Sequence, residues 1–426
     1  MNKLKVGILG CGSRGCETYG RLIYPLKDQF EIVTLCDIRQ DRLDKYAKEF
    51  KISKDNLFKD EDEFFKEKRA DVLFICTLDK DHVRQAIKAL NLGYHLLLEK
   101  PISSDINELK SLLKAKERSG KEVIVCHVLR YAKAFLKVNE LINKGIIGSL
   151  VHIQALEQVG WYHQAHSFVR GNWHNTIDTA PMIMAKCCHD LDLLQFYAKS
   201  KADSVSSIGD LRFFNKEHKP QGASNRCLEC QYVDTCPYSA KVIYIDGWYK
   251  RGKPDNEWPF NVVTESNPLT EESIYDGIKN TDYGKCVFEC DNNAVDNEVS
   301  MIKFQNGVTA SLTMIGFTGQ IGRIMKFYGT YGEIDLDEEK GIIEIKRFSK
   351  DVEIIKIEDL TEASGMAHGG GDYMIVSSLY DAITKGNSTT KLEDSIESHL
   401  MAIKLEESRL QGGKLIKVHK TQNTSI

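Results

Sequence analysis

Three glycines near the start of the chain are spaced as in a turn that holds phosphate groups. The apolar residues 6–9 are followed by Gly10, Gly12 and Gly15, and the residues after them can form a helix. In a G-x-G-x-x-G turn, the first glycine permits the tight turn, the second lets a pyrophosphate approach the backbone, and the third lets helix and strand pack closely. Backbone N–H groups and the positive helix end would then bind the phosphates. The spacing therefore predicts a dinucleotide site.

An acidic residue stands where the ribose of such a dinucleotide would bind. Asp37 ends the next apolar run, residues 32–36, about 20 residues beyond the glycines. A carboxylate there accepts hydrogen bonds from a ribose diol and repels a 2′-phosphate, which favours NAD over NADP. Arg14 and Arg39 are close enough in sequence to weaken this preference. The alternative is that Asp37 only caps the helix expected to begin near Asp41.

Strands and helices alternate over the first part of the chain. After the first strand, apolar runs predict strands at residues 31–37, 71–76, 95–99 and 123–127, with helices between them. This alternation predicts an α/β fold with a doubly wound parallel sheet covered on both faces. Because ligands of such sheets bind at the carboxyl ends of the strands, we expect the cofactor to contact the glycine turn and the strand ends through Gly10, Gly12, Ser13, Arg14, Gly15, Asp37, Thr77, Asp79, His82, Glu99 and Lys100.

The pattern changes after about residue 130. Strands dominate residues 298–357, and two helices close the chain, which predicts an α+β domain with a large, open and mainly antiparallel sheet. Residues 216–290 form a polar insertion that contains cysteines and shows few periodic signals. We therefore expect a dinucleotide-binding domain over residues 1–130 and a domain for substrate binding and oligomerisation over residues 131–426.

Composition excludes several classes of function. The 426 residues carry a net charge of −4 with no basic block, which gives no reason to expect a nucleic-acid partner. No apolar run approaches about 20 residues, so no membrane span is expected. The sequence begins directly with a strand rather than a signal peptide, so we expect a cytoplasmic protein. In that compartment the twelve cysteines would be reduced thiols or metal ligands rather than disulfides.

Five of these cysteines fall in or next to the insertion. Cys227, Cys230 and Cys236 lie within ten residues, and Cys286 and Cys290 follow later. A structural Zn²⁺ takes four ligands and would close a loop that lacks its own core. We expect zinc at Cys227, Cys230, Cys236 and Cys286, with Cys290 as the alternative fourth ligand. Reduced thiols in a packed loop and an iron–sulfur cluster are the other interpretations.

Several motifs together resemble the glucose–fructose oxidoreductase/inositol dehydrogenase (Gfo/Idh/MocA) family. They are the glycine turn, Glu99-Lys100-Pro101 after the fifth strand, and His189-Asp190 in a helix of the second half. A narrower subgroup of oxidoreductases is similar through HSFVRGNW, AKCCHDLDLL, CLECQYVDTCPYSA and HGGGD. The resemblance covers essentially the whole chain. It implies a Rossmann domain, NAD(P) as cofactor, and reversible oxidation of a sugar or cyclitol hydroxyl.

The resemblance places Lys100 and His189 at the nicotinamide and the substrate carbon. Lysine at a strand end is a poised cation or, when desolvated, a proton carrier, and histidine can accept a hydroxyl proton as hydride leaves. Family dehydrogenases often carry aspartate four residues before this histidine, where this chain has Ala185. We expect Lys186 to take that role or to contact an anionic substrate group. The alternatives are a solvated Lys100–Glu99 pair and a histidine that only caps or packs.

Residues 160–174 concentrate aromatic, imidazole and cationic side chains. Tryptophan offers an apolar plate for a sugar face, and arginine a bidentate contact to carboxylate or phosphate. In the H-G-G-G-D motif, Asp372 either reaches substrate or only caps the following helix. A loop folded on its own aromatic residues and a catalytic metal bound by its histidines are the alternatives. The expected substrate contacts are His127, Arg130, Tyr162, His163, His166, Arg170, Asn172, Trp173 and His368.

These motifs lead to one main functional hypothesis and two alternatives. We expect an NAD-dependent oxidoreductase that transfers a hydride between a sugar or cyclitol hydroxyl and nicotinamide. Because the usual aspartate is missing, an NAD-dependent glycoside hydrolase or lyase that oxidises the sugar transiently is the first alternative. A non-catalytic NAD-binding regulator is the second. The resemblance also implies a homodimer or homotetramer formed through the sheet of residues 298–357.

Overall fold

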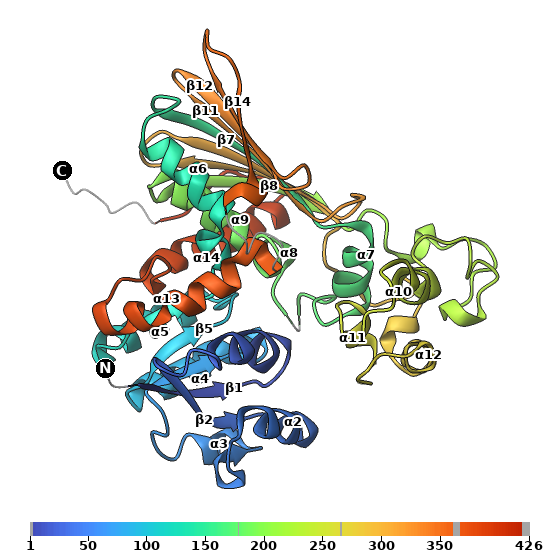
Figure 1. Ribbon diagram of the computed structural model, residues 1–426. Helices are drawn as coiled ribbons and strands as arrows, with labels where there is room; N and C mark the ends of the chain where they lie inside the picture. Colours follow the sequence, from blue (N-terminus) through green and yellow to red (C-terminus); the bar gives the residue numbers. More distant parts are fainter. Residues whose placement is uncertain (1–2, 178, 265, 361–366, 420–426) are drawn as a thin grey trace.

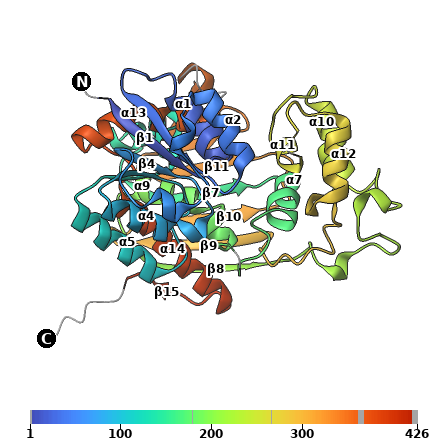
Figure 2. The ribbon, with the colours of Figure 1, turned by 90° about the horizontal axis from the view of Figure 1, so that it is seen from below.

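The computed structural model describes residues 3–177, 179–264, 266–360 and 367–419. Figure 1 shows two sheets at opposite ends of the molecule, with helices between them and the insertion to one side. The view from below in Figure 2 places the insertion helices on the same side. The site described below lies where these three parts meet.

The first sheet is parallel throughout, in the order β3-β2-β1-β4-β5-β6. Its central strands are buried because helices cover both faces, which is why they read as unbroken apolar runs. The strand order reverses between β1 and β4, so a ligand crevice is expected at their carboxyl ends. The predicted doubly wound sheet is confirmed, with strands β1 (Leu4–Leu9), β2 (Phe30–Cys36), β3 (Leu57–Phe58), β4 (Val72–Ile75), β5 (His95–Leu98) and β6 (Val123–Val125).

Helices lie between the strands of this half, as the alternation of the sequence predicts. The segment after the glycines differs, because it forms a π-helix, Ser13–Gly20, that continues into α1 (Arg21–Ile23). Asp60 and Asp105 start two helices by accepting backbone N–H bonds from the first turn. The remaining helices are α2 (Gln40–Phe50), α3 (Glu61–Phe64), α4 (His82–Asn91) and α5 (Ile106–Ser119).

The second sheet has the order β14-β13-β12-β11-β7-β10-β9-β8-β15. Its pairs are antiparallel except β7 with β10, so the prediction of a mainly antiparallel sheet is confirmed. Alternate residues of β9 are buried, because one face packs on helices and the other is open. The strands are β7 (Leu150–Gln158), β8 (Ala202–Asp210), β9 (Asn297–Phe304), β10 (Thr309–Ile315), β11 (Gly322–Gly329), β12 (Gly332–Asp337), β13 (Ile342–Arg347), β14 (Glu353–Lys356) and β15 (Ile416–Lys417).

Helices from distant parts of the sequence cover the inner face of this sheet. Val138, Leu194 and Leu405 come from three such helices and share one apolar core with Ile153 and Phe327 of the sheet. Burying side chains of this size stabilises the fold by about 1.5–3 kcal/mol each. The helices are α6 (Lys133–Asn143), α8 (Met182–Ala185), α9 (Cys188–Ala198) and α14 (Leu392–Leu410).

Helix α13 (Gly371–Lys385) returns from the C-terminal half to the first sheet. Its Ile375 and Leu379 lie in the same apolar cluster as Val6 and Ile8 of β1. A residue near the C-terminus can therefore contact the glycine turn directly. This packing could not be predicted from local sequence patterns, because nothing in an amphipathic helix identifies the sheet that it covers.

The insertion has its own apolar core, which includes Phe214, Tyr244, Phe260 and Ile274. The expectation of little regular structure is wrong here, since residues 241–280 contain several short helices. Closely spaced aromatic residues in short turns hide the helical period, and only the Thr270–Ser273 capping box gives a clear local signal. The helices are α7 (Trp161–His163), which adjoins the insertion, α10 (Gly247–Lys250), α11 (Phe260–Val263) and α12 (Glu271–Asn280).

Over residues 3–177, 179–264, 266–360 and 367–419, none of the helices combines the length and the apolar character of a membrane span.

Candidate active site

The glycine turn is shaped by close backbone contacts. A Cβ on Gly10, which has φ of +90°, would lie 2.5 Å from the carbonyl oxygen of Cys76, and one on Gly15 would lie 1.9 Å from that of Gly10. At Gly12 the nearest atom to such a Cβ is a guanidinium nitrogen of Arg42, at 3.3 Å. Gly10 and Gly15 are thus fixed by packing against backbone, whereas Gly12 faces the end of a flexible arginine side chain, which can move when a diphosphate approaches.

Asp37 is buried at the end of β2 and holds the glycine turn. Its Oδ2 accepts the backbone N–H of Cys11 at 2.6 Å, and its Oδ1 accepts that of Arg39 at 2.9 Å. Helix α2 follows Arg39 without a side-chain cap, so Asp37 does not cap it. A carboxylate has about four acceptor positions, so sites remain for a ribose diol.

Arg14 connects the glycine turn to β5 and α13. Its Nε donates to Glu99 Oε1 at 2.7 Å, and its Nη2 donates to Asp372 Oδ1 at 2.7 Å. The hydroxyl of Tyr19 donates to the same Glu99 oxygen at 2.9 Å. Burial would raise the pKa of Glu99, but the charges of Arg14 and Lys100 outweigh burial and lower it. Glu99 is therefore ionised, and its carboxylate is held by the hydrogen bonds of this network.

Lys100 and His189 come from different halves of the chain and lie close enough for the charge of Lys100 to act on the imidazole. The Lys100 ammonium donates to the carbonyl oxygen of Ala185, at the end of α8, at 3.3 Å. His189 is 6% exposed, and burial, followed by the charge of Lys100, lowers its pKa well below the usual value. Among the described residues, its Nδ1 has no hydrogen-bond partner. The site thus presents a neutral imidazole with a free ring nitrogen next to a lysine, and Lys100 does not form the solvated pair with Glu99.

His127 and His368 lie next to His189, and His399 lies behind His127. The ring centroid of His127 lies 5.8 Å from that of His189, and that of His368 lies 6.0 Å from it. Burial lowers the pKa of His127 well below its usual value, and neither ring nitrogen of His127 bonds to any residue that the structure describes. His399 lies behind His127, with ring centroids 5.7 Å apart. It accepts the Ile102 N–H at 2.8 Å, and this hydrogen bond fixes its neutral form.

Lys186 is paired with a buried carboxylate. Its Nζ lies 2.9 Å from Glu157 Oε1, and Glu157 is 0% exposed. Arg323 lies 2.9 Å from the other oxygen of Glu157 and 2.8 Å from Asp190. Burial raises the pKa of Asp190 to about 7 in spite of Arg323. The structure therefore places Lys186 in a buried charge network next to His189 in sequence, with its ammonium held by Glu157.

Among the expected substrate residues, Tyr162 and His163 face the insertion. The ring centroid of His163 lies 4.8 Å from that of Trp258 and the Tyr162 ring lies 6.0 Å from it. Burial is the main reason that the pKa of His163 falls well below its usual value, and the charges of Lys186 and Lys100 lower it further. Trp258 is a residue that the sequence analysis missed. Its only signal is a tryptophan–proline pair in a polar segment.

Other residues expected to contact substrate are either bonded to other parts of the protein or exposed. Arg130 forms a bidentate pair with Asp192 at 2.6 and 2.8 Å, both buried. His166 bonds the Tyr244 hydroxyl at 3.0 Å inside the insertion core. Arg170 is also buried in the insertion, while Asn172 and Trp173 are exposed, Trp173 at 38%. Much of the 160–174 loop is thus folded on the aromatic residues of the insertion.

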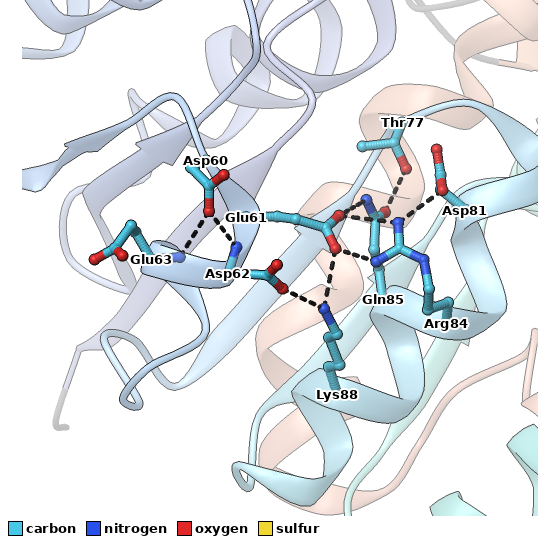
Figure 3. Close-up of polar contacts among 9 residues, drawn as sticks. All are labelled: Asp60, Glu61, Asp62, Glu63, Thr77, Asp81, Arg84, Gln85 and Lys88. Atoms are coloured by element: carbon cyan, nitrogen blue, oxygen red, sulfur yellow. Dashed lines mark hydrogen bonds and ion pairs between the residues drawn. The ribbon is translucent and has the colours of Figure 1, made fainter.

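Thr77 is positioned by a polar network on the outer helices. Its hydroxyl donates to Gln85 at 2.6 Å, and Gln85 donates to Glu61 at 2.8 Å (Figure 3). Glu61 also pairs with Arg84 and Lys88. The hydrogen bond from Arg84 is the main reason that the pKa of Glu61 falls to about 2. The network keeps Thr77 fixed at the carboxyl end of β4, where the crevice is expected.

Asp79 and His82 connect this strand end to neighbouring loops. Asp79 accepts the backbone N–H of Ala180 at 3.3 Å, which links the cofactor side to the second half of the chain. His82 is buried, with its ring nitrogens 2.8 Å from the Pro101 oxygen and 3.1 Å from the Thr77 oxygen. The structure therefore places His82 between two loops of the crevice as a positioning group.

The cysteines do not form the predicted zinc centre. Within the described ranges, no three His, Cys, Asp or Glu side chains are grouped so that they could hold a metal ion. Structural zinc at Cys227, Cys230, Cys236 and Cys286 is thus not supported, although all four line one cavity. The prediction used ligand type and number, but spacing along a chain does not determine how far apart the sulfurs stand.

The N-terminal region matches a known family. Residues 4–127 match the profile of the Gfo/Idh/MocA oxidoreductase family, described by its NAD-binding Rossmann fold. Over this stretch the chain is similar to that family. The match includes the glycine turn, Asp37, Thr77 and Lys100, so a family of NAD-binding proteins shares the region that forms the crevice.

Relatives extend the similarity beyond this domain. The Bacillus subtilis (strain 168) protein YteT, which is named as an oxidoreductase, is 22% identical over 395 residues, 88% of each chain. Inositol 2-dehydrogenase of Salmonella typhimurium (strain LT2) is 30% identical over 156 residues, 35% of this chain and 45% of that protein. The solved structure of levoglucosan dehydrogenase with NADH and levoglucosan has a TM-score of 0.70 and 16% identity, covering 98% of this chain and 100% of that one. The fold is shared over nearly the whole length, and the comparisons support an NAD(P)-dependent oxidoreductase.

Proposed function

We propose that this protein transfers a hydride between NAD and a hydroxyl-bearing carbon of a sugar or cyclitol derivative. The observation that carries the proposal is the meeting of Lys100 and His189 from two halves of the chain. Gly12 and Asp37 provide the space for the diphosphate and the acceptor for the ribose. The names of the relatives that act on inositol and levoglucosan agree with a polyhydroxylated substrate.

The two side chains divide the proton chemistry between them. Bound NAD would supply the hydride acceptor. The neutral His189 has a free ring nitrogen that can take the hydroxyl proton as hydride leaves, and Lys100 can stabilise negative charge that develops on the same oxygen. General acid–base help of this kind is worth about 10²–10⁴-fold in rate. His163 and Trp258 then form the wall against which a ring substrate would lie.

We propose NAD rather than NADP as the preferred cofactor. The Asp37 carboxylate lies at the end of β2, where a 2′-phosphate would meet its negative charge. Arg42 Nη1 stands 3.8 Å from Asp37 and offsets part of that charge. Calorimetric titration with each dinucleotide tests this, and tighter binding of NADP would contradict it.

The decisive experiment separates three functions. Purified protein is denatured and searched by mass spectrometry for dinucleotide and sugar, and then assayed with NAD against a panel of sugars, cyclitols and aryl glycosides. Formation of NADH with an oxidised product supports the proposal. Release of the aryl group without NADH accumulation would instead show an NAD-dependent glycoside hydrolase. Tight NAD binding without turnover of the whole panel would favour a regulator.

We also propose that the open face of the second sheet mediates self-association. Ile208, Val299 and Met301 are exposed there, and Ile208 pairs directly with Val299 across β8 and β9. Burying such side chains between two copies would remove apolar area from water. Light scattering coupled to gel filtration measures the oligomer, and a monomer at high concentration would contradict this proposal.

A further inference from the structure

Two lysine side chains come together at the end of α8. Lys100, which follows β5, donates to the carbonyl oxygen of Ala185 at 3.3 Å. Lys186 follows Ala185 directly, so the backbone that the first ammonium contacts also carries the second lysine. Burial is the main cause of the lowered pKa of His163, and the charges of both lysines add to it. The candidate active site thus contains two ammonium groups in one region.

The carboxylates of this region lie behind the second amine. The Lys186 side chain is 15% exposed, whereas that of Glu157, whose Oε1 lies 2.9 Å from the ammonium, is 0% exposed. Arg323 lies 2.9 Å from the other oxygen of Glu157 and also pairs with Asp190, which is buried. A ligand that enters the crevice therefore reaches the Lys186 ammonium before it reaches these acids.

Both ammonium groups keep hydrogen-bond donors that the protein does not use. A lysine ammonium has three N–H donors and no acceptor. Within the residues that the structure describes, the Lys100 ammonium contacts the Ala185 oxygen and forms no ion pair, and the Lys186 ammonium contacts Glu157. Glu99, the neighbour of Lys100 in sequence, is paired with Arg14 instead. The remaining donors fit a ligand that supplies acceptor oxygens.

The acids behind the amines offset their charge only in part near neutral pH. Burial raises the pKa of Asp190 to about 7 in spite of Arg323, and burial also raises the pKa of Glu338 above its usual value. Glu338 lies 4.0 Å from Arg323 on the same network. Two lysines and one arginine therefore face acids that are partly protonated, and this excess of positive charge favours an anionic ligand.

A carboxylate is the anion that suits the free donors of Lys186. It offers two acceptor oxygens and carries a single charge, so it is repelled less by Glu157 than a phosphate group with nearly two charges. We propose that the substrate is a sugar acid whose carboxylate binds the Lys186 ammonium, while the reacting hydroxyl lies between Lys100 and His189. The position of the hydroxyl rests on the proposed function, whereas the carboxylate site does not depend on hydride transfer.

The test is calorimetric titration of the full-length protein, saturated with NADH, with matched pairs of sugar acids and neutral sugars. The pairs are D-glucuronate with D-glucose, D-galacturonate with D-galactose, and D-gluconate with D-glucitol. The reduced cofactor is used because it leaves the hydroxyl groups unoxidised during the titration. We expect at least one acid to bind about tenfold more tightly than its neutral partner, because a charge-assisted hydrogen bond is stronger than a neutral one. This difference should shrink as NaCl is raised.

Substitutions of Lys186 assign the preference to its ammonium. Lys186→Met should remove the preference for the acid and leave the affinity for the neutral sugar within about threefold. Lys186→Arg keeps a cation with donors for a carboxylate and should retain most of the preference. Lys326→Met is the matched control, because Lys326 pairs with Asp335 of the second sheet at 3.1 Å, as Lys186 pairs with Glu157 of that sheet. It should bind as the wild type does.

Four results would overturn the proposal. In the wild-type protein they are equal or tighter binding of the neutral sugar in every pair, no binding of any acid, or tighter binding of D-glucose 6-phosphate than of D-glucuronate. The fourth is a folded Lys186→Met variant that keeps the wild-type preference. Because the first three use only the wild-type protein, an unstable variant does not leave the question open.

The same titrations separate this proposal from the proposed function. Binding of an acid that depends on Lys186, without NADH formation when NAD replaces NADH, would refute hydride transfer and support the carboxylate site. Turnover of neutral sugars by a protein that shows no preference for acids would support hydride transfer and refute the carboxylate site.

Discussion

Arg14 and Asp372 form an ion pair at 2.7 Å although they lie near opposite ends of the chain. Arg14 belongs to the glycine turn, and Asp372 lies in the first turn of α13. His368 bonds Asp372 at 2.8 Å, and its ring centroid lies 6.0 Å from that of His189. The pair therefore connects the glycine turn with the histidine that we propose as the proton acceptor, and changes at α13 should alter the binding of the cofactor.

Replacing Asp372 by Asn tests this connection. Because Arg14 then loses one of its two carboxylates, the dissociation constant of NAD should rise by about tenfold, or about 1.4 kcal/mol. Calorimetric titration with NAD measures the change. Asp381→Asn alters an exposed carboxylate of the same helix and should bind NAD as the wild type does. Equal affinity in all three proteins would show that the pair is only structural.

The same variant should have a distinct pH dependence of stability. Burial would raise the pKa of Asp372, but Arg14 and His368 outweigh burial and hold it well below the usual value. A carboxylate with a depressed native pKa stabilises the fold above its unfolded pKa of about 3.9, and this contribution is lost as the pH falls further. The free-energy difference between wild type and Asp372→Asn, measured by urea unfolding, should thus be constant near neutrality and shrink below about pH 4.

Lys100→Met should separate catalysis from cofactor binding. Removing the ammonium should lower kcat by about 10²–10⁴-fold, because charge on the reacting oxygen is no longer stabilised, while the NAD dissociation constant stays within about threefold. The charge of Lys100 also lowers the pKa of His189. The variant should therefore show a higher His189 pKa by NMR titration of the imidazole signals, assigned with His189→Gln. Unchanged turnover would reject the role.

The buried histidines predict a loss of stability in mild acid. Burial lowers the pKa of His399 to about 3. Because the unfolded chain takes up a proton near pH 6.5 and the folded chain does not, the free energy of unfolding falls with decreasing pH below 6.5, by up to about 1.4 kcal/mol per pH unit for each such group. His399→Gln should reduce that slope between pH 6 and 5 in urea unfolding. The exposed His218→Gln should leave the slope unchanged, and equal slopes in both variants would contradict this assignment.

The sequence predicted the elements that have a clear local pattern. The parallel sheet, the open second sheet and the closing helices follow from apolar runs and alternation, and Lys100 follows from its place at a strand end. Asp37 also lies where its spacing predicts. These features depend on neighbours in sequence, so one chain is enough to find them.

The partners of these residues could not be predicted in the same way. Arg14 was expected to contact the cofactor, but nothing near it in sequence identifies Asp372 as its counter-ion. Arg130 was expected at the substrate, and its bidentate bonds to Asp192 depend on how α9 packs. The sequence shows that a buried charged residue needs an oppositely charged partner. Which residue forms that ion pair depends on the tertiary packing.

Arg323→Met should destabilise the fold strongly. It would leave Glu157 and Asp190 buried with fewer counter-charges, and breaking a buried pair costs about 3–5 kcal/mol. Removing Arg323 should also raise the pKa of Asp190 above its value of about 7. The loss of unfolding free energy relative to the wild type should then be larger at pH 8 than at pH 5, because protonation at the lower pH removes the charge of an unpaired carboxylate. Arg347→Met, at the exposed Glu353 pair, should cost less than about 1 kcal/mol by urea unfolding.

Trp258 should determine how tightly the substrate binds. It reaches the site from the insertion, with its ring centroid 4.8 Å from that of His163. Asn256, in the same segment, donates to Glu17 at 2.6 Å, next to the glycine turn, so the segment is held against the cofactor side. A sugar face packs on such a ring. Loss of the Trp258 ring should therefore raise KM by about tenfold, with a smaller change in kcat.

The comparison of Trp258→Ala with Trp258→Phe makes this prediction specific. Phenylalanine keeps an aromatic face, so Trp258→Phe should recover most of the wild-type KM, whereas alanine should not. Tyr249→Ala is the control, because Tyr249 is an exposed aromatic residue of the same insertion that contacts Glu271 on its outer side. Steady-state kinetics with a substrate found in the NAD assay gives KM and kcat for all three. An unchanged KM in folded Trp258→Ala would show that the substrate does not reach this wall, and the binding site would then lie between His189 and His368 alone.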